Sequence, residues 1–195
     1  MKPSLVLLAG PNGAGKSTFY QTRIAPHFAG PFINADIIQR DELKDRSPEA
    51  SYDAARIADD RRSRMLELRK SFATETVFSH PSKLQFIDDA KGRGYIVIVA
   101  HVGVESADLS VARVRERTRE GGHDVPEDKI RARYDRGKPL IRDAVLRADR
   151  GMVFDNSRLN QPPQQVLLFA DGRLVQAAPI LPNWVLTTYD ADLSR

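Results

Sequence analysis

The sequence predicts an α/β fold, a doubly wound and mainly parallel sheet with helices packed on it. Three observations predict this fold. Residues 5–9 form a continuous apolar run, as in a strand that is buried on both faces of a parallel sheet. Segments typical of strands then alternate with segments typical of helices. Near the end of the chain, two apolar segments flank Asp171-Gly172, a dipeptide that favours a tight β-hairpin turn.

Local signals define the elements of the first half of the chain. Ser47-Pro48-Glu49 has the pattern of a helix start, with Pro at the first helical position and an acid beside it. Gly92-Arg93-Gly94 is typical of a helix end. We expect, in order, strand 5–9, helix 16–24, strand 32–34, helix 47–70, strand 72–78 and helix 83–91.

The second half begins with the longest strand signal, at residues 95–104. Three helices are expected over residues 107–120, 126–136 and 141–148, and we expect the stretch 107–150 to lie as a helical, Arg-rich lid over one end of the sheet. A strand at 151–154 precedes the two hairpin strands, 166–169 and 173–175. Residues 161–195 form a C-terminal extension in which no element is assigned after Pro179.

Length and composition favour one cytoplasmic domain that spans residues 1–195. A chain of 195 residues is the usual size of a single domain. The absence of Cys excludes disulfides and thiolate metal sites. The longest apolar run, residues 95–100, is too short to span a membrane, and the apolar N-terminus lacks the cleavage site of a signal peptide. We therefore expect no membrane association.

The positive charge of the chain is concentrated in one segment. The formal net charge is +4, and residues 113–150 alone carry ten Arg and two Lys against eight acids. Arg is suited to gripping phosphate or carboxylate with two parallel hydrogen bonds. An excess of four charges is weak support for nucleic-acid binding, which usually needs a broad basic face.

A phosphate-binding loop follows the first strand. Gly10-Pro11-Asn12-Gly13-Ala14-Gly15-Lys16-Ser17 matches the pattern G-x-x-x-x-G-K-[ST] between a strand and a helix. Backbone N–H groups of such a loop surround phosphate oxygens, Lys16 can reach the β- and γ-phosphates, and the Ser17 hydroxyl can bind Mg²⁺. The alternative is an ordinary glycine turn. We expect ATP and Mg²⁺ as cofactors, held by Gly10, Pro11, Asn12, Gly13, Ala14, Gly15, Lys16, Ser17 and Thr18.

Two carboxylates are candidates for the acceptor side of the site. Asp36 follows the strand at 32–34, at the edge where the chemistry of open α/β sheets gathers, and there it can orient a hydroxyl and take its proton. Its alternative role is a helix N-cap. Glu75 lies between apolar neighbours in a strand, where it can assist Mg²⁺ or hold substrate with Thr76, or form an ion pair with an Arg.

The Arg-rich segment offers phosphate ligands. Arg113 and Arg117 share one helix face, and Gly121-Gly122 joins that helix to the next as a hinge. We expect two or three arginines, among them Arg113, Arg117 and Arg133, to act on phosphates or substrate, and the rest to form a solvated, ion-paired surface. His101 and His123 are expected to be structural, and no zinc site is expected. Asp155-Asn156-Ser157 is expected near the nucleotide base or as a cap.

The combination of these motifs resembles the zeta toxin family, and in its hinge sequence the short, stand-alone bacterial members. The resemblance covers about residues 4–158. It rests on the loop and on the segments Phe32-Ile33-Asn34-Ala35-Asp36, Ala73-Thr74-Glu75-Thr76, Gly121-Gly122-His123-Asp124-Val125-Pro126-Glu127 and Phe154-Asp155-Asn156-Ser157.

The resemblance implies a P-loop kinase whose acceptor is UDP-N-acetylglucosamine or a related nucleotide sugar, with an antitoxin protein as partner. It implies that Lys16 and Ser17 bind ATP and Mg²⁺, that Asp36 activates the sugar hydroxyl, and that Glu75 lies on the substrate and metal side. Arg117 matches a phosphate-clamping Arg of the family. The second clamping Arg has no match, and Arg131, Arg133 and Arg136 are its candidate substitutes.

The leading hypothesis is therefore an ATP- and Mg²⁺-dependent kinase that acts on a hydroxyl of a small molecule, with Asp36, Lys16 and Arg117 as catalytic residues. The alternative is a nucleotide-binding regulatory or interaction ATPase without such an acceptor. A kinase for nucleic-acid ends is disfavoured, because Tyr134 is the only aromatic residue within 113–150. Trp184 and Tyr189 either shape a substrate wall or complete the fold.

Overall fold

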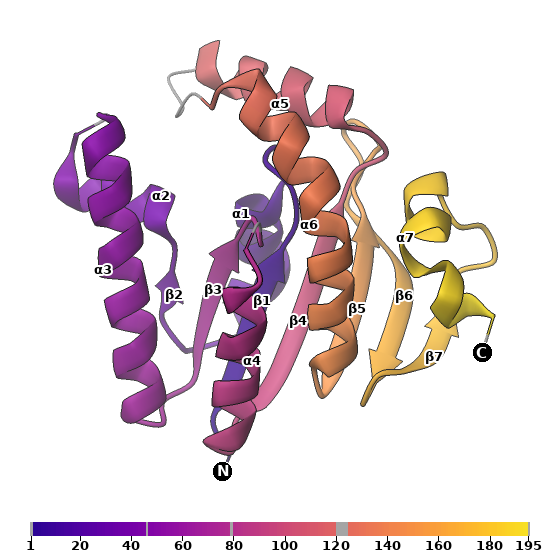
Figure 1. Ribbon diagram of the computed structural model, residues 1–195, viewed down its shortest axis with the longest axis horizontal. Coiled ribbons are helices and arrows are strands. Elements are labelled where there is room, and N and C mark those ends of the chain that lie inside the picture. Colours follow the sequence, from indigo (N-terminus) through magenta and orange to yellow (C-terminus); the bar gives the residue numbers. More distant parts are fainter. Residues whose placement is uncertain (1, 46, 79, 120–124, 195) are drawn as a thin grey trace.

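Seven strands form one sheet in the part of the chain that the computed structural model describes, residues 2–45, 47–78, 80–119 and 125–194 (Figure 1). Their order is β2-β3-β1-β4-β5-β6-β7. The first five strands along the chain pair in parallel, and β6 and β7 add an antiparallel hairpin at one edge. The strands are β1 (Ser4–Ala9), β2 (Phe32–Ile33), β3 (Phe72–Thr76), β4 (Ile96–Gly103), β5 (Arg150–Asp155), β6 (Gln164–Ala170) and β7 (Arg173–Ala177). The predicted fold class is confirmed.

Helices begin near the predicted residues in most of the chain. Ser47 caps the long helix α3 by accepting a hydrogen bond from the Ala50 N–H, and Pro48 occupies its first position. The short helix α1 continues in wider turns over Tyr20–Ile24. The helices are α1 (Lys16–Phe19), α2 (Ala35–Ile37), α3 (Pro48–Glu67), α4 (Ser82–Gly92), α5 (Ala107–Arg119), α6 (Glu127–Arg147) and α7 (Asn183–Leu193). No helix in the described ranges is long and apolar enough to cross a membrane.

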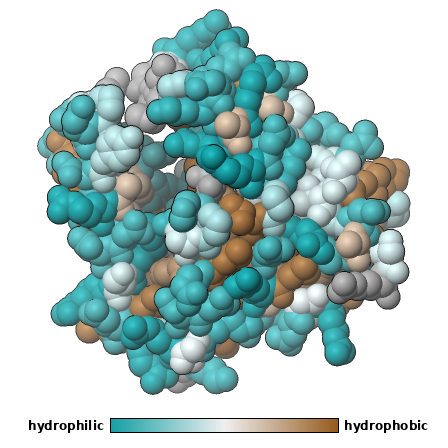
Figure 2. Space-filling model, in the orientation of Figure 1, coloured by the Kyte–Doolittle hydropathy of each residue, from teal (hydrophilic) through white to brown (hydrophobic). Residues whose placement is uncertain are grey.

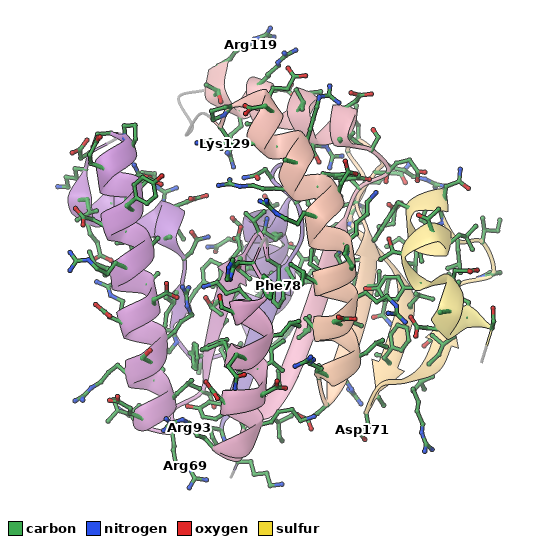
Figure 3. The ribbon with its side chains drawn as sticks, viewed as in Figure 1. Arg69, Phe78, Arg93, Arg119, Lys129 and Asp171 are labelled. Carbon is green, nitrogen blue, oxygen red and sulfur yellow. The ribbon has the colours of Figure 1, made fainter. Side chains whose placement is uncertain are left out.

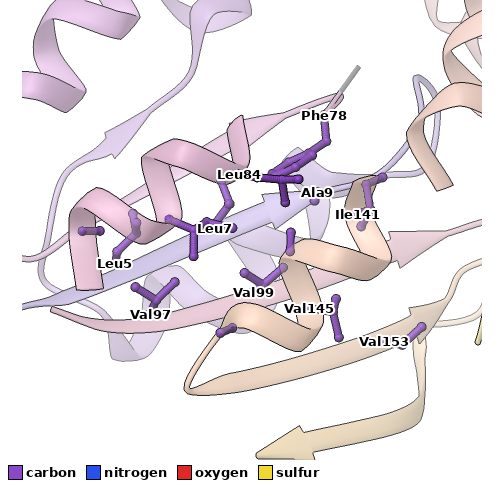
Figure 4. Close-up of a cluster of buried hydrophobic side chains, with 14 of the residues drawn as sticks. Leu5, Leu7, Ala9, Phe78, Leu84, Val97, Val99, Ile141, Val145 and Val153 are labelled. Carbon is purple, nitrogen blue, oxygen red and sulfur yellow. The ribbon is translucent and has the colours of Figure 1, made fainter. Parts of the chain in front are cut away.

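The central strand β1 is buried on both faces, as its continuous apolar run predicts. Leu5 and Leu7 belong to a core shared with α4 and α6, which is shown in Figure 4. Val6 and Leu8 belong to a second core on the opposite face, with Phe19 and other residues. Because apolar burial is the main favourable term in folding, these two cores hold the carboxyl end of β1, where the glycine-rich loop begins, in a defined place.

One sequence prediction is wrong: a single helix, α6, replaces the two helices expected over 126–136 and 141–148. Pro139 lies inside this helix, where proline normally removes a backbone hydrogen bond. The helix continues because Tyr134, Ile141 and Val145 are all buried along it, and their burial outweighs the local cost. Its last turns pack on β4 and β5, so the part of 107–150 that stands above the sheet end is α5 and the start of α6 (Figure 1).

Helix α7 fills the part of the C-terminal extension to which the sequence assigned no element. Trp184, Val185 and Tyr189 are at most 3% exposed and join the core of α4 and α6. The hydroxyl of Tyr189 lies 2.8 Å from Nδ1 of His101, which is buried in β4. His101 is therefore buried and hydrogen-bonded, as expected of a structural residue, and both aromatic residues pack in the core.

Burial of His101 predicts a loss of stability in mild acid. Burial first, and then the nearby positive charges of Lys138 and Lys16, lower the pKa of His101 from 6.5 to about 3. The unfolded chain takes up this proton below pH 6.5 while the folded chain does not, so the free energy of unfolding falls as the pH drops from about 6.5 towards 3.

Between pH 7 and pH 5, we expect the free energy of unfolding to fall by about 2 kcal/mol more in the wild-type protein than in the His101→Gln variant. Denaturant unfolding at the two pH values measures this difference. Parallel losses in the two proteins would mean that another group is responsible.

Candidate active site

The glycine-rich loop has the backbone geometry of a phosphate cradle. Gly13 and Gly15 have φ angles of 72° and 83°, in the left-handed region that favours glycine. A Cβ atom on Gly15 would lie 2.6 Å from Nδ2 of Asn156, so the close approach of that side chain also requires glycine. Oδ1 of Asn12 is buried and has no hydrogen-bond partner among the described residues. Glycine is therefore required at both positions, as is expected of a phosphate-binding loop.

Lys16 and Ser17 both meet the carboxylate of Glu75. The Lys16 amine is 5% exposed, donates to the Pro11 carbonyl oxygen at 3.0 Å and lies 3.5 Å from Oε1 of Glu75. The Ser17 hydroxyl donates to Oε2 of Glu75 at 2.7 Å. The cation beside Glu75 is thus Lys16 and not an arginine. Parallel pairing of β1 with β3 brings these residues together, with Leu8 in register with Glu75.

Asn34 links Glu75 to the helix that carries Asp36. Its Oδ1 accepts hydrogen bonds from the N–H groups of Asp36 and Ile37 at 2.8 and 3.3 Å, which makes Asn34 the N-cap of α2. Its Nδ2 donates to Oε2 of Glu75 at 2.8 Å. The cap role considered for Asp36 therefore belongs to Asn34. The carboxylate of Asp36 is exposed and accepts no hydrogen bond from any described residue.

A cleft of about 750 Å³ lies beside the loop. The four residues predicted to hold substrate, Asp36, Glu75, Thr76 and Arg133, all line it, together with Asn12 of the loop. Its other lining residues are Asn34, Ala35, Pro48, Ser51, Tyr52, Ala55, Asp59, Arg62, Val77, Lys83, Thr118, Val125, Pro126 and Lys129. Figure 2 shows a largely hydrophilic face that is hollowed between the side of α3 and the side of α5 and α6.

The cations of the cleft fall into two groups. Arg62 and Lys83 share the carboxylate of Asp59, at 2.5 and 3.2 Å. On the other wall, Lys129 and Arg133 of α6 make no ion pair with any residue in the described ranges. Figure 3 shows Lys129 on the side of α6 that faces α3. The cleft therefore presents two positive charges that no acid of the described chain neutralises.

Most of the other arginines behave as surface ion pairs. Arg115 and Arg131 both pair with Glu127, and Arg131 also pairs with Asp108 at 2.7 Å. Such exposed pairs contribute little to stability. Arg131 is thus occupied and is a poor substitute for a phosphate clamp. Arg136 lines no part of the cleft.

Arg113 and Arg117 have different surroundings although they share a helix. Arg113 lies beside the loop, with its Cβ 3.3 Å from where a Cβ on Gly13 would be, and its Nη2 is 3.5 Å from the Ser157 carbonyl oxygen. Burial lowers the pKa of Arg113, although Asp155 and Glu116 oppose that shift. Arg117 is exposed and is not among the residues that line the cleft. Residues 121–124, which the sequence predicts to form a hinge and which include His123, lie outside the described residues.

The segment 155–157 supports the loop from the end of β5. Nδ2 of Asn156 donates to the Ala14 carbonyl oxygen at 2.9 Å, and the Ser157 hydroxyl accepts from the Glu105 N–H at 2.9 Å. The contact of Asn156 with Ala14 had only a weak signal in the sequence, since the two residues are 142 positions apart. Asn34 and Asn156 are the two site residues whose roles the sequence analysis missed.

The donor set fits a magnesium nucleotide. No group of three or more His, Cys, Asp or Glu side chains able to hold a metal occurs among the described residues. The Ser17 hydroxyl and the Glu75 carboxylate offer two adjacent oxygens, and Mg²⁺ characteristically takes few protein ligands and completes its shell with water and phosphate oxygens.

Neutralising Glu75 is expected to destabilise the protein. Lys16 is nearly buried, so the Glu75→Gln variant leaves its charge without a counter-ion at a cost of about 3 kcal/mol. Glu67→Gln is the matched control, because Glu67 is exposed and pairs weakly with Arg64 at 3.7 Å. Denaturant unfolding compares the two variants with wild type. An equal, small effect in both would show that the Lys16–Glu75 pair does not stabilise the fold.

Comparisons with known proteins show what this chain is similar to. The family model described as Zeta toxin matches residues 1–161. An uncharacterized protein of Haemophilus influenzae is 28% identical over 138 residues, which are 69% of this chain and 94% of that one. Among solved structures, that of the PezAT chromosomal toxin–antitoxin system of Streptococcus pneumoniae has a TM-score of 0.63 and 15% identity, and the match covers 99% of this chain and 86% of that chain.

The AvrRxo1-ORF1:-ORF2 complex with ATP is a second structural neighbour, with a TM-score of 0.67 and 15% identity. The match covers 89% of this chain and 60% of that chain, so this protein spans well under the full length of that neighbour. At such identities the likeness shows the fold alone, a P-loop α/β fold. The family match covers most of the chain, and it carries the conclusion: this protein belongs to the zeta toxin family.

Proposed function

We propose that this protein is an ATP- and Mg²⁺-dependent phosphotransferase that phosphorylates a hydroxyl group of a small molecule bound in the cleft. One observation carries the proposal: a single cleft of about 750 Å³ is lined by Asn12 of the phosphate loop and by Asp36, whose carboxylate accepts no hydrogen bond from the described residues. A purely regulatory ATPase has no need for such a cleft beside its loop.

The loop and its neighbours hold the nucleotide. The backbone N–H groups between Gly10 and Ser17 bind the phosphates, and the Lys16 amine exchanges the Pro11 carbonyl oxygen for a phosphate oxygen. Ser17 and Glu75 hold Mg²⁺, which supplies charge neutralisation on the phosphate oxygens. Arg113, beside the loop, adds positive charge on the nucleotide side, and Arg117 is the phosphate-clamping residue that the family resemblance implies.

Asp36 activates the acceptor. The hydroxyl oxygen forms a bond to the γ-phosphorus while the bond from that phosphorus to the leaving oxygen of ADP breaks, and Asp36 accepts the hydroxyl proton. The backbone of Asp36 is held through Asn34 to Glu75, which contacts Lys16 and Ser17. This chain of contacts keeps the base at a constant place relative to the phosphate site, and positioning is most of what phosphoryl transfer requires.

The cleft suits an acceptor that itself carries negative charge. Lys129 and Arg133 have no acidic partner in the described part of the chain, and the volume is in the range of small-molecule sites. A nucleotide sugar such as UDP-N-acetylglucosamine, the acceptor implied by the family resemblance, has both the size and the charge. Thr76 completes the acceptor wall next to Glu75.

A transfer assay tests the proposal. The protein is incubated with Mg²⁺-ATP and a panel of nucleotide sugars, nucleosides and neutral sugars, and products are read by mass spectrometry. We expect one phosphoryl group to be added to a nucleotide sugar. ATP hydrolysis with no phosphorylated acceptor would instead support the regulatory ATPase, and transfer to neutral sugars only would contradict the role of Lys129 and Arg133.

We also propose that an antitoxin protein binds this chain, since the PezAT neighbour is described as part of a toxin–antitoxin system. Expression of this protein in a bacterial host is expected to slow growth. Co-expression with the antitoxin should restore growth. Normal growth without that protein would argue against an antitoxin partner.

A further inference from the structure

We propose that helix α7, through Trp184, is a positioning element of the nucleotide site. This inference rests on the proposed ATP binding. Helix α7 (Asn183–Leu193) lies beyond residues 1–161, which the family model matches, so the family does not assign it a role. In Figure 1 it packs beside the sheet at the edge opposite α3.

The indole of Trp184 is seated at the carboxyl end of β4. A Cβ atom on Gly103 would lie 2.3 to 2.7 Å from three atoms of the indole, so the ring rests directly on the glycine backbone. Trp184 is 3% exposed, and its ring also meets the His101 ring edge-on, at 5.1 Å between centroids. The ring therefore has one well-defined place.

From this place the indole reaches the end of β5. Its Nε1–H donates to Oδ1 of Asp155 at 2.8 Å, and the Ser157 hydroxyl donates to the same oxygen. Asp155 is thereby hydrogen-bonded both to Trp184 of α7 and to Ser157 of its own segment. Hydrogen bonds to a charged acceptor are stronger than those between neutral groups, and they fix the position of both partners.

The segment 155–157 in turn touches the nucleotide site twice. Asn156 donates to the Ala14 carbonyl oxygen inside the phosphate loop, at 2.9 Å. The Ser157 carbonyl oxygen lies 3.5 Å from the guanidinium of Arg113, whose charge also interacts with Asp155. Trp184 thus acts on the loop through Asp155 and the two residues that follow it. It is a positioning residue and does not itself touch the phosphates.

The test compares two aromatic-to-Phe variants of α7. Trp184→Phe keeps a buried ring but removes the hydrogen bond to Asp155. Tyr189 lies on the same helix as Trp184. Tyr189→Phe removes its hydroxyl contact with His101 of β4 and leaves the hydrogen bonds of Asp155 in place. Calorimetric titration of the full chain with Mg²⁺-ATP gives the Kd, and thermal unfolding gives the stability of each variant.

We expect Trp184→Phe to weaken ATP binding about threefold to tenfold, and Tyr189→Phe to leave the Kd within about twofold of wild type at a similar loss of stability. Equal Kd values in the two variants would overturn the inference. Wild-type protein that binds no ATP would overturn the proposed function instead.

The chain offers a second readout that needs no variant. Trp184 is its single tryptophan, so intrinsic tryptophan fluorescence reports on the surroundings of this indole, including its contact with Asp155. We expect its emission to change as Mg²⁺-ATP saturates the protein, with the midpoint that calorimetry gives. Unchanged emission at saturation would overturn the inference even if Trp184→Phe fails to fold.

Discussion

The Lys16→Ala variant is expected to lose at least two orders of magnitude in the rate of phosphoryl transfer. Phosphoryl transfer depends on neutralising charge on the phosphate oxygens, and removal of one preorganised donor commonly costs about 100- to 1,000-fold. Lys16 is buried beside the loop, and its amine lies 3.0 Å from the Pro11 carbonyl oxygen. Folding has therefore already removed water from the positive charge of Lys16 and fixed that charge beside the loop.

Single-turnover transfer from labelled ATP measures this loss. Lys70→Ala is the control, because Lys70 is exposed and lies two residues before β3, at the end of the strands opposite the loop. We expect the control to retain wild-type activity. Undiminished transfer by Lys16→Ala would remove the loop from the mechanism.

The Asp36→Asn variant is expected to bind ATP normally and to lose about 100- to 10,000-fold in kcat, the usual contribution of a general base. The substitution is structurally mild. Asn34 holds α2 through the backbone N–H of Asp36 and not through its carboxylate, so the cap survives the change. The Kd for ATP is expected to stay constant because Asp36 lies on the acceptor wall of the cleft.

Parallel measurement of kcat and of the ATP Kd separates these two effects. Asp41→Asn is the matched control, since Asp41 pairs with the neighbouring Arg40 on the surface. Wild-type kcat in Asp36→Asn would show that another group accepts the proton. Loss of ATP binding would instead place Asp36 on the nucleotide side.

The sequence placed the site better than it described its connections. Residues 10–17 and the position of Asp36 after a strand are local patterns, and the structure finds both at the carboxyl edge of the sheet. The contacts of Asn34 with Glu75 and of Asn156 with Ala14 span 41 and 142 residues. No local pattern indicates such pairs, because an Asn side chain serves equally as a turn, a cap or a surface residue.

The second helical stretch shows how packing overrides local signals. Gly137 and Pro139 are typical of a break, yet α6 runs through both because its apolar face is buried against β4 and β5. Packing also accounts for α7. Its sequence carries no strong helix-start signal, but Trp184 and Tyr189 are almost fully buried, and their burial stabilises the helix.

By itself, then, the sequence determined the fold class, the phosphate loop and the order in which most strands and helices follow one another along the chain, since glycine spacing and apolar periodicity act over a few residues. Only the tertiary structure decided which arginines are occupied by acids, which asparagines support the loop, and how the C-terminal helix meets it. These choices depend on which side chains the folded sheet brings within hydrogen-bond distance, and that distance is set by packing between segments far apart in the chain.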